Sequence, residues 1–228
     1  YCLGHLIEAG VAHHEATGKS ALLDVAQRAA ALIETTFGTA GRAEVCGHEE
    51  IELALIKLGR HTGLPKWTNL ARRFVALRGD ASQRPIWGEY YQDHLPIGRH
   101  RQIVGHAVRA TYLYSAAADL MMDGDRFLGP ALDRVWRDLT TRKMYVTGGI
   151  GTSAANEGFT RAYDLPNESA YAETCAGIGL CLWAHRMNLA TGDARYVDVL
   201  ERALMNAVMR GVSRSGDRFF YDTPFSSD

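Results

Sequence analysis

The chain has 228 residues, 46% of them hydrophobic, and its 25 Lys and Arg against 26 Asp and Glu give a formal net charge of −1. Such a chain can bury a sizeable core, and the balanced charge without a run of like residues argues against a nucleic-acid partner. No apolar run approaches the roughly 18 residues of a membrane span, so we expect no membrane partner either.

The ends and the cysteines of the chain carry further expectations. Tyr1 lies inside a helical pattern, with neither an initiating Met nor the pattern of a signal peptide before it, so we expect the sequence to be truncated at both ends. The four cysteines form no dense framework. They predict free thiols in a reducing compartment, which we take to be the cytoplasm. The sequence makes no prediction about the oligomeric state.

The apolar residues follow helical spacing almost throughout, which predicts an all-α protein. A degenerate repeat of two helices joined by a tight turn occurs four times, at residues 4–33, 47–77, 105–136 and 175–208. In each copy a Thr-Gly or Asp-Gly pair ends the first helix, because Gly suits the left-handed conformation just after a helix.

Three segments interrupt these helical hairpins, and we expect the first two to be site-forming loops and the third to begin a β region. They span residues 78–102, 143–173 and 211–228. Classical helical solenoids keep a nearly fixed period, whereas the first helices here begin at growing intervals. We therefore expect an incomplete double-layered α/α barrel in which the N-termini of the inner helices meet at one mouth.

Three of the first helices begin with Gly-His, and their histidines are His5, His48 and His106. A single histidine at a helix start is most often a structural hydrogen-bonding group. Three at equivalent positions favour a shared polar pocket, because inner helices contribute their first turns to the cavity.

The fourth repeat begins with Glu173 and Cys175 in place of Gly-His. Side chains two positions apart in a helix point about 200° apart around its axis. Glu173 and Cys175 can therefore reach one point only if Glu173 precedes the helix. Carboxylate and thiolate are zinc ligands, but zinc requires about four in total. The alternative is an acid favoured by the helix dipole beside a buried structural thiol.

The glycine-rich segment 147–159 contains Glu157. A phosphate-binding loop is disfavoured, because the Gly-Lys-Ser/Thr ending of a P-loop and a strand-to-helix context are both missing. Two carboxylates near one mouth are typical of glycoside hydrolases, in which one protonates the leaving oxygen. A solvated loop carboxylate is the alternative for Glu157. Loop aromatics are candidate sugar-stacking faces or core residues: Trp87, Tyr90, Tyr91, Tyr145, Phe159 and Tyr163.

An ordered series of motifs resembles glycoside hydrolase family 127, the β-L-arabinofuranosidase family, along essentially the whole chain. The motifs are YCLGHLIEAG, GHEEIELALIKLGRHTG, VGHAVRATYLYSAAADL, MYVTGGIG, NEGFTRAYDLPNESAYAETCA and ERALMNAVMRGVS. The resemblance implies that residues 1–228 are part of an (α/α)6-barrel catalytic domain, followed in complete members by β-sandwich domains.

The resemblance also implies a retaining glycosidase that releases β-linked L-arabinofuranose, or a related sugar, with a zinc-bound cysteine as nucleophile. Glu157 matches the general acid/base, and Glu173 and Cys175 match two zinc ligands. His5, His48 and His106 match residues that line the sugar subsite. A thiolate held by zinc is a competent nucleophile because the cation lowers the pKa of the thiol.

One departure from the family pattern concerns the nucleophile. The family takes it, and the fourth zinc ligand, from an adjacent Cys-Cys pair downstream, and no such pair occurs before Asp228. We therefore expect this stretch alone to hold zinc weakly and to be inactive. The competing hypothesis from another class is a helical-repeat module that binds a peptide on its concave face without catalysis.

Overall fold

The structure is a computed structural model that describes residues 1–226, and that part of the chain contains eight α-helices. They are α1 (Cys2–Thr17), α2 (Ala21–Phe37), α3 (Ile51–Thr62), α4 (Pro65–Leu77), α5 (Ala107–Met122), α6 (Gly129–Asp138), α7 (Thr174–Thr191) and α8 (Ala194–Ala203). Short 3₁₀ and π turns lie in the connections and after α6 and α8. The predicted all-α class and the four helical hairpins are confirmed.

Glycines cap three of the four first helices as the sequence predicts, whereas α5 is capped by Asp123, with a φ of −81°, and Gly124 comes next. Gly18, Gly63 and Gly192 cap α1, α3 and α7 with φ values of 71°, 68° and 69°. A residue with a Cβ rarely adopts this left-handed conformation, so glycine lets the chain reverse at once into the second helix.

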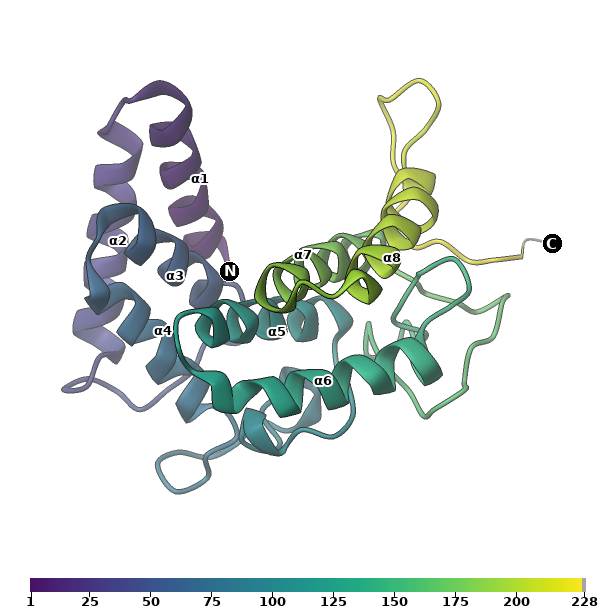
Figure 1. The fold of residues 1–228 in the computed structure, drawn as a ribbon, viewed down its shortest axis with the longest axis horizontal. Helices are drawn as coiled ribbons and strands as arrows, with labels where there is room; N and C mark the ends of the chain where they lie inside the picture. The colour runs from purple at the N-terminus through teal and green to yellow at the C-terminus, as the bar shows by residue number, and fades with distance from the viewer. Residues whose placement is uncertain (227–228) are drawn as a thin grey trace.

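The hairpins form two layers of helices (Figure 1). In one layer α1 packs against α3, α3 against α5, and α5 against α7; each second helix packs on its own first helix. The middle of α5 is buried on nearly every face, and its Leu113 and Tyr114 are fully buried. The strongly amphipathic α6 and α8 cover the outside with one apolar face each.

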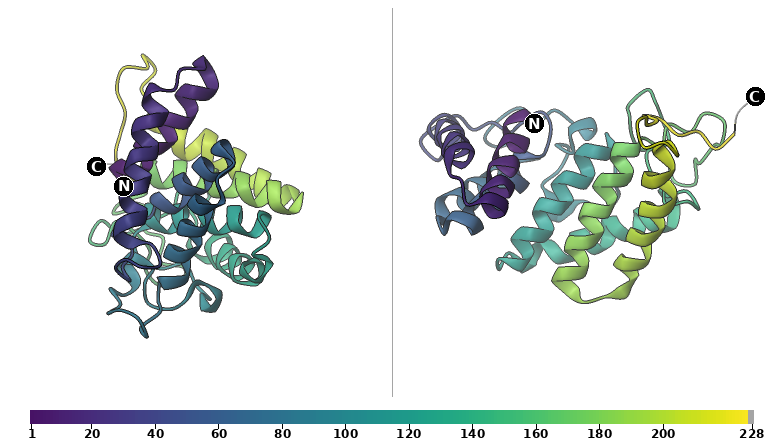
Figure 2. Two further views of the ribbon diagram at one scale, coloured as in Figure 1. Left: turned by 90° about the vertical axis from the view of Figure 1, so that its left-hand side faces the viewer. Right: turned by 90° about the horizontal axis from the view of Figure 1, so that it is seen from above.

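The first turns of the inner helices lie at the same side of the molecule. In the right-hand view of Figure 2, the N-terminus, the loop region after α6 and the C-terminal segment line the upper edge, whereas the turn between α7 and α8 lies at the lower edge. The four repeats thus place their helix starts and the long loops together, as the interval pattern predicts.

The C-terminal segment folds back onto the start of α7. Val212 and Phe219 form an antiparallel bridge, and the backbone N–H of Thr174 donates to the carbonyl of Tyr221 at 2.9 Å. The predicted beginning of a β region is present here as isolated bridges and backbone pairing, without a regular strand among residues 1–226.

None of the described helices is long and apolar enough to cross a membrane. The four cysteines are free thiols within the part of the chain that the structure covers.

Candidate active site

Glu157 and His106 form the central pair of the site. His106 is the residue just before α5, and its Nε2 lies 3.0 Å from Glu157 Oε2. The Nδ1 atom of the same ring accepts a hydrogen bond from the backbone N–H of Arg109 at 3.3 Å. Nδ1 therefore carries no proton, and Nε2–H donates to the carboxylate. Burial, together with the Arg109 charge, lowers the pKa of His106 and favours this neutral form.

Backbone pairing fixes the segment that carries Glu157. The Ala107 N–H donates to the carbonyl of Glu157 at 3.0 Å, and His106 and Gly158 form an antiparallel bridge. The approach is so close that a Cβ on Gly158 would overlap the Gly105 carbonyl. Glu157 itself has a φ of 48°, an uncommon conformation for a residue with a side chain. The surroundings thus determine where this carboxylate points.

Tyr90 and Arg109 border the pair. The Tyr90 hydroxyl donates to Glu157 Oε2 at 3.3 Å, and the Arg109 guanidinium stacks on the Tyr90 ring at 4.6 Å. Nε and Nη1 of Arg109 have no hydrogen-bond partner within residues 1–226. Both recorded donors to Glu157 act on Oε2, so Oε1 is the oxygen available to hold a proton for a ligand.

A row of rings extends the site from His106 to α1. The His48 ring lies 5.8 Å from that of His106 and 4.4 Å from that of Tyr1, and Tyr1 lies 4.6 Å from His5. Tyr112 of α5 lies near both His5 and His48. The three histidines of the Gly-His starts are therefore linked by one row of neighbouring rings, and the polar pocket expected from them stays a prediction.

His48 is held in one neutral tautomer. Its Nδ1 lies 3.0 Å from the carbonyl oxygen of Glu49, which only accepts hydrogen bonds, so Nδ1 carries the proton and Nε2 remains an acceptor. Burial lowers the pKa of His48 to about 4. The ring is therefore uncharged at neutral pH.

Glu173 and Cys175 lie at the start of α7. Glu173 is the residue just before the helix, the placement that lets both side chains reach the same point, and Cys175 is in the first turn. Burial and the adjacent Glu173 raise the pKa of the Cys175 thiol to about 12. Tyr221 of the C-terminal segment also lies here, and hydrogen bonding to Glu173 raises the pKa of its hydroxyl.

The donor atoms of this pair suit zinc. The Glu173 side chain is buried, and its Oε2 has no hydrogen-bond partner among the described residues. A buried carboxyl group without a partner holds a proton or faces a cation, and one oxygen and one sulfur donor at this point match the ligand chemistry of zinc. Glu157 and Glu173 each lie close enough to His106 and to Tyr171 for their negative charges to favour the protonated forms of both groups.

The loop aromatics divide between site and core. Tyr90 contacts Glu157, and Tyr91 meets the Tyr90 ring edge to face and lies under the Arg109 guanidinium. Tyr145 and Phe159 are buried in the core, whereas Trp87 and Tyr163 are largely exposed.

Five residues of the site were not singled out from the sequence: Tyr1, Arg109, Tyr112, Tyr221, and Glu50, whose buried Oε1 lies 3.2 Å from His5 Nδ1. Glu50 and Arg109 follow a Gly-His histidine by two and three positions, which was the available signal. Nothing in the local pattern of Tyr221 indicates its place, because only the folding back of the C-terminal segment brings it to Glu173.

Comparison with known proteins identifies the family. The model of the β-L-arabinofuranosidase GH127 catalytic domain matches residues 1–228. A non-reducing end β-L-arabinofuranosidase of Bifidobacterium longum subsp. longum is 36% identical over 242 residues, covering 97% of this chain and 37% of that protein.

Two solved structures share the fold and much of the sequence. A GH127 β-arabinofuranosidase is 44% identical with a TM-score of 0.94 over 99% of this chain and 36% of its own. A GH127 β-L-arabinofuranosidase from Geobacillus stearothermophilus T6 is 43% identical with a TM-score of 0.93 over 98% of this chain and 38% of its own.

The chain thus spans little more than a third of the length of these relatives. The match over all 228 residues, in sequence and in structure, shows that the chain belongs to the GH127 β-L-arabinofuranosidase family and lies in its catalytic domain.

Proposed function

We propose that this chain is part of a retaining glycoside hydrolase that releases β-linked L-arabinofuranose or a related sugar from a glycoside. The observation that carries the proposal is the Glu157 carboxylate, which His106 and Tyr90 hold in place and which acts on His106 together with the charge of Glu173. The names of the relatives support the choice of sugar. No observation on the described residues favours the alternative of a peptide-binding repeat module.

Glu157 is the general acid and base in this proposal. Because His106 and Tyr90 donate to Oε2, the proton resides on Oε1 and passes to the glycosidic oxygen as the bond breaks. In the second step the same oxygen accepts a proton from the attacking water. The neutral His106 ring keeps the carboxylate aimed throughout, since its Nδ1 is occupied by the backbone of α5.

The sugar lies along the row of histidines in this proposal. His48 presents Nε2 as an acceptor, so a sugar hydroxyl donates to it. His5 and His106 line the same surface, and the Tyr1 and Tyr112 rings offer apolar faces to the sugar.

Glu173 and Cys175 are two ligands of a zinc ion in the proposal. Bound zinc would supply the positive charge that keeps thiols as thiolates near neutral pH. We assign the nucleophile to a thiol from the rest of the longer protein. Cys181 is unsuited, because it lies farther along α7 with its Sγ directed to the Leu200 carbonyl.

Substitution of the proposed acid tests the function directly. In the longer protein that contains the complete catalytic domain, we expect Glu157→Gln to lower kcat/KM on an alkyl β-L-arabinofuranoside by about 10²- to 10⁴-fold, the usual contribution of a general acid. A dinitrophenyl glycoside, whose leaving group needs no proton, should lose less in the glycosylation step.

Glu168→Gln is the matched control, because Glu168 is an exposed carboxylate on the same loop. It should retain wild-type kinetics. A Glu157→Gln variant with undiminished turnover of the alkyl glycoside would remove Glu157 from the mechanism.

A further inference from the structure

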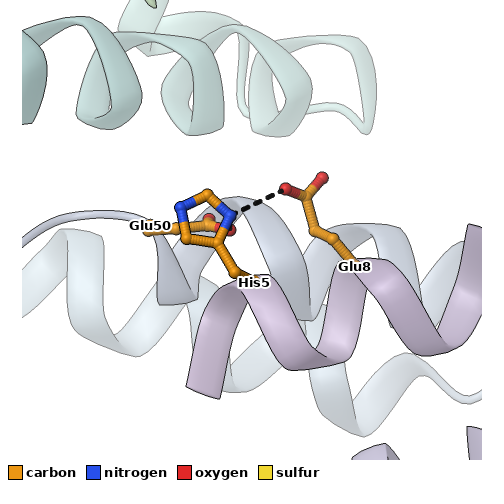
Figure 3. Close-up of side chains that lie close together, drawn as sticks. All are labelled: His5, Glu8 and Glu50. Carbon is orange, nitrogen blue, oxygen red and sulfur yellow. Dashed lines mark ion pairs between the residues drawn. The ribbon is translucent and has the colours of Figure 1, made fainter. Parts of the chain in front are cut away.

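A buried carboxyl group lies behind His5 (Figure 3). Glu50 is the residue just before α3, and its side chain is 0% exposed. Neither of its oxygens has a hydrogen-bond partner with full geometry within residues 1–226. A carboxyl group without partners is costly to bury. Glu50 therefore has to be neutralised by a proton or a cation. It also needs a neighbouring polar group that can reach its oxygens through a small movement.

Two groups on α1 are the available neighbours. His5 Nδ1 lies 3.2 Å from Glu50 Oε1, and Glu8, one turn further along the helix, places Oε2 4.0 Å from the same nitrogen. The ligand atoms of the three side chains all lie within 4.8 Å of one another. Lys57 Nζ lies 3.6 Å from Glu8 Oε1, so Glu8 already faces a permanent positive charge.

Gly4 allows α1 to lie directly on the carboxyl group. A Cβ at this position would be 3.0 Å from Glu50 Cδ, closer than ordinary van der Waals contact. The helix backbone thus excludes water from Glu50 on this side, whereas the His5 side chain remains 41% exposed and open to a ligand. The buried Glu50 carboxyl group thus lies next to the accessible imidazole of His5.

We propose that Glu50 is a positioning residue for His5: as a neutral carboxyl group it donates to Glu8 and accepts from His5 Nδ1–H, so that Nε2 faces the sugar as a hydrogen-bond acceptor. The inference deepens the proposed function and rests on it. Burial, and then the negative charge of Glu8, raise the pKa of Glu50, which agrees with a carboxyl group that keeps its proton at neutral pH.

This arrangement sets the tautomer of His5. A histidine at a half-exposed site otherwise turns freely and exchanges its proton between both nitrogens. With Nδ1–H directed to Glu50, Nε2 is the nitrogen left for a ligand. The ring would then act like His48, whose Nδ1 is directed to a backbone carbonyl. Two acceptors along one surface fit a sugar that offers hydroxyl protons.

Two variants of Glu50 test whether it acts as a neutral hydrogen-bonding group. Met and Gln have nearly the volume of Glu, and Gln keeps both a donor and an acceptor. In the longer protein we expect Glu50→Met to lower kcat/KM for a 4-nitrophenyl β-L-arabinofuranoside about tenfold, mainly through KM, as for one lost hydrogen bond. Glu50→Gln should remain within about twofold of the wild type.

A double-mutant cycle shows whether Glu50 acts through His5. In a His5→Ala background, Glu50→Met should cause no further loss of kcat/KM. Glu15→Met is the matched control, since Glu15 forms a similar pair with His61, at 3.3 Å, at the far ends of α1 and α3. It should change neither kinetic constant.

The tautomer of His5 can also be measured directly, without a substrate. Histidine-selective ¹⁵N NMR of the longer protein should show His5 protonated at Nδ1 in the wild type and in Glu50→Gln, and a mixture of tautomers in Glu50→Met. A wild-type His5 protonated at Nε2 overturns the proposal, whichever glycoside the protein cleaves. A wild type that cleaves no arabinofuranoside, but has the expected tautomer, contradicts the proposed function and leaves the positioning of His5 supported.

Two further outcomes overturn the inference. Additive losses in the double variant would mean that Glu50 supports the fold and not His5. The second outcome is a divalent cation held by His5, Glu8 and Glu50. Elemental analysis would then show a metal equivalent that disappears in Glu50→Gln, and that variant would lose as much activity as Glu50→Met.

Discussion

The histidines of the mouth differ in which ring nitrogen is available. His106 donates through Nε2, because its Nδ1 accepts from the α5 backbone. His48 has the opposite tautomer, because its Nδ1 faces a carbonyl. The difference arises from position: His106 directly precedes a helix, whereas His48 is separated from α3 by Glu49 and Glu50. Similar Gly-His starts thus supply both a donor and an acceptor.

A fourth histidine, His100, has a structural role that the sequence did not reveal. It is fully buried, with Nδ1 3.0 Å from the Tyr114 hydroxyl and Nε2 2.8 Å from the Leu95 carbonyl. Burial lowers the pKa of His100 to about 4. The ring donates through Nε2 to the Leu95 carbonyl and accepts at Nδ1 from the Tyr114 hydroxyl, so in its neutral form it joins the 78–102 loop to α5.

We therefore predict that His100 makes stability depend on pH. Between its unfolded pKa of about 6.5 and its folded value, the unfolded chain binds the extra proton, so stability is full above pH 6.5 and declines toward pH 4. One such group can lower the free energy of unfolding by at most about 1.4 kcal/mol per pH unit. In urea unfolding, the free energy of unfolding should fall less between pH 7 and pH 5 in His100→Gln than in the wild type. Equal declines would contradict this assignment.

At the scale of elements, the contact of α5 with α7 positions both halves of the site. α5 carries His106 at its start, and α7 begins next to Glu173. The two helices pack directly against each other, and Gly179 of α7 meets Thr111 of α5. Because a helix moves as a unit, the spacing of this pair sets the separation of the two carboxylates at the mouth.

Gly179→Ala tests this contact. The new Cβ would overlap Thr111 Oγ1, so we expect the free energy of unfolding to fall by about 1–3 kcal/mol, as for other overpacked sites. Thr111→Ala removes the clashing oxygen and should reduce that penalty in the double variant. Gly98→Ala, which meets nothing within 4 Å, is the control. Urea unfolding compares the four variants with the wild type, and an equal penalty of Gly179→Ala in both Thr111 backgrounds would contradict the clash.

At the scale of the whole molecule, four hairpins supply one side of a site. We propose that they are part of an (α/α)6 barrel, in keeping with the expected architecture and with the share of the relatives that the chain spans. In the proposed zinc site Glu173 and Cys175 would provide two donors, whereas zinc binds about four. The proposal therefore takes the remaining ligands from the rest of the catalytic domain.

Zinc content should therefore depend on the length of the chain. After dialysis against a weak chelator, we expect the longer protein to keep about one zinc ion per chain and residues 1–228 alone to keep little. Glu173→Gln should lower the zinc content of the longer protein. Equal retention by the two chains would show that the 228 residues complete the site themselves.

Much of the fold follows from local patterns. The spacing of apolar residues predicted the four hairpins, and the Thr-Gly and Asp-Gly pairs predicted their turns, because both depend on residues close in sequence. The growing intervals and the repeated Gly-His starts also predicted that His5, His48 and His106 share one surface. Their roles, and those of Glu157, Glu173 and Cys175, remain proposals.

The sequence by itself determined the helices, their turns and which polar residues begin the inner layer, since helix geometry converts spacing into faces. Only the tertiary structure decided which ring nitrogen His48 and His106 present, that Glu50 is buried behind His5, and that Tyr221 reaches Glu173. These features depend on contacts between residues tens of positions apart, whose distances and loss of water are set by how the helices pack and not by any local pattern.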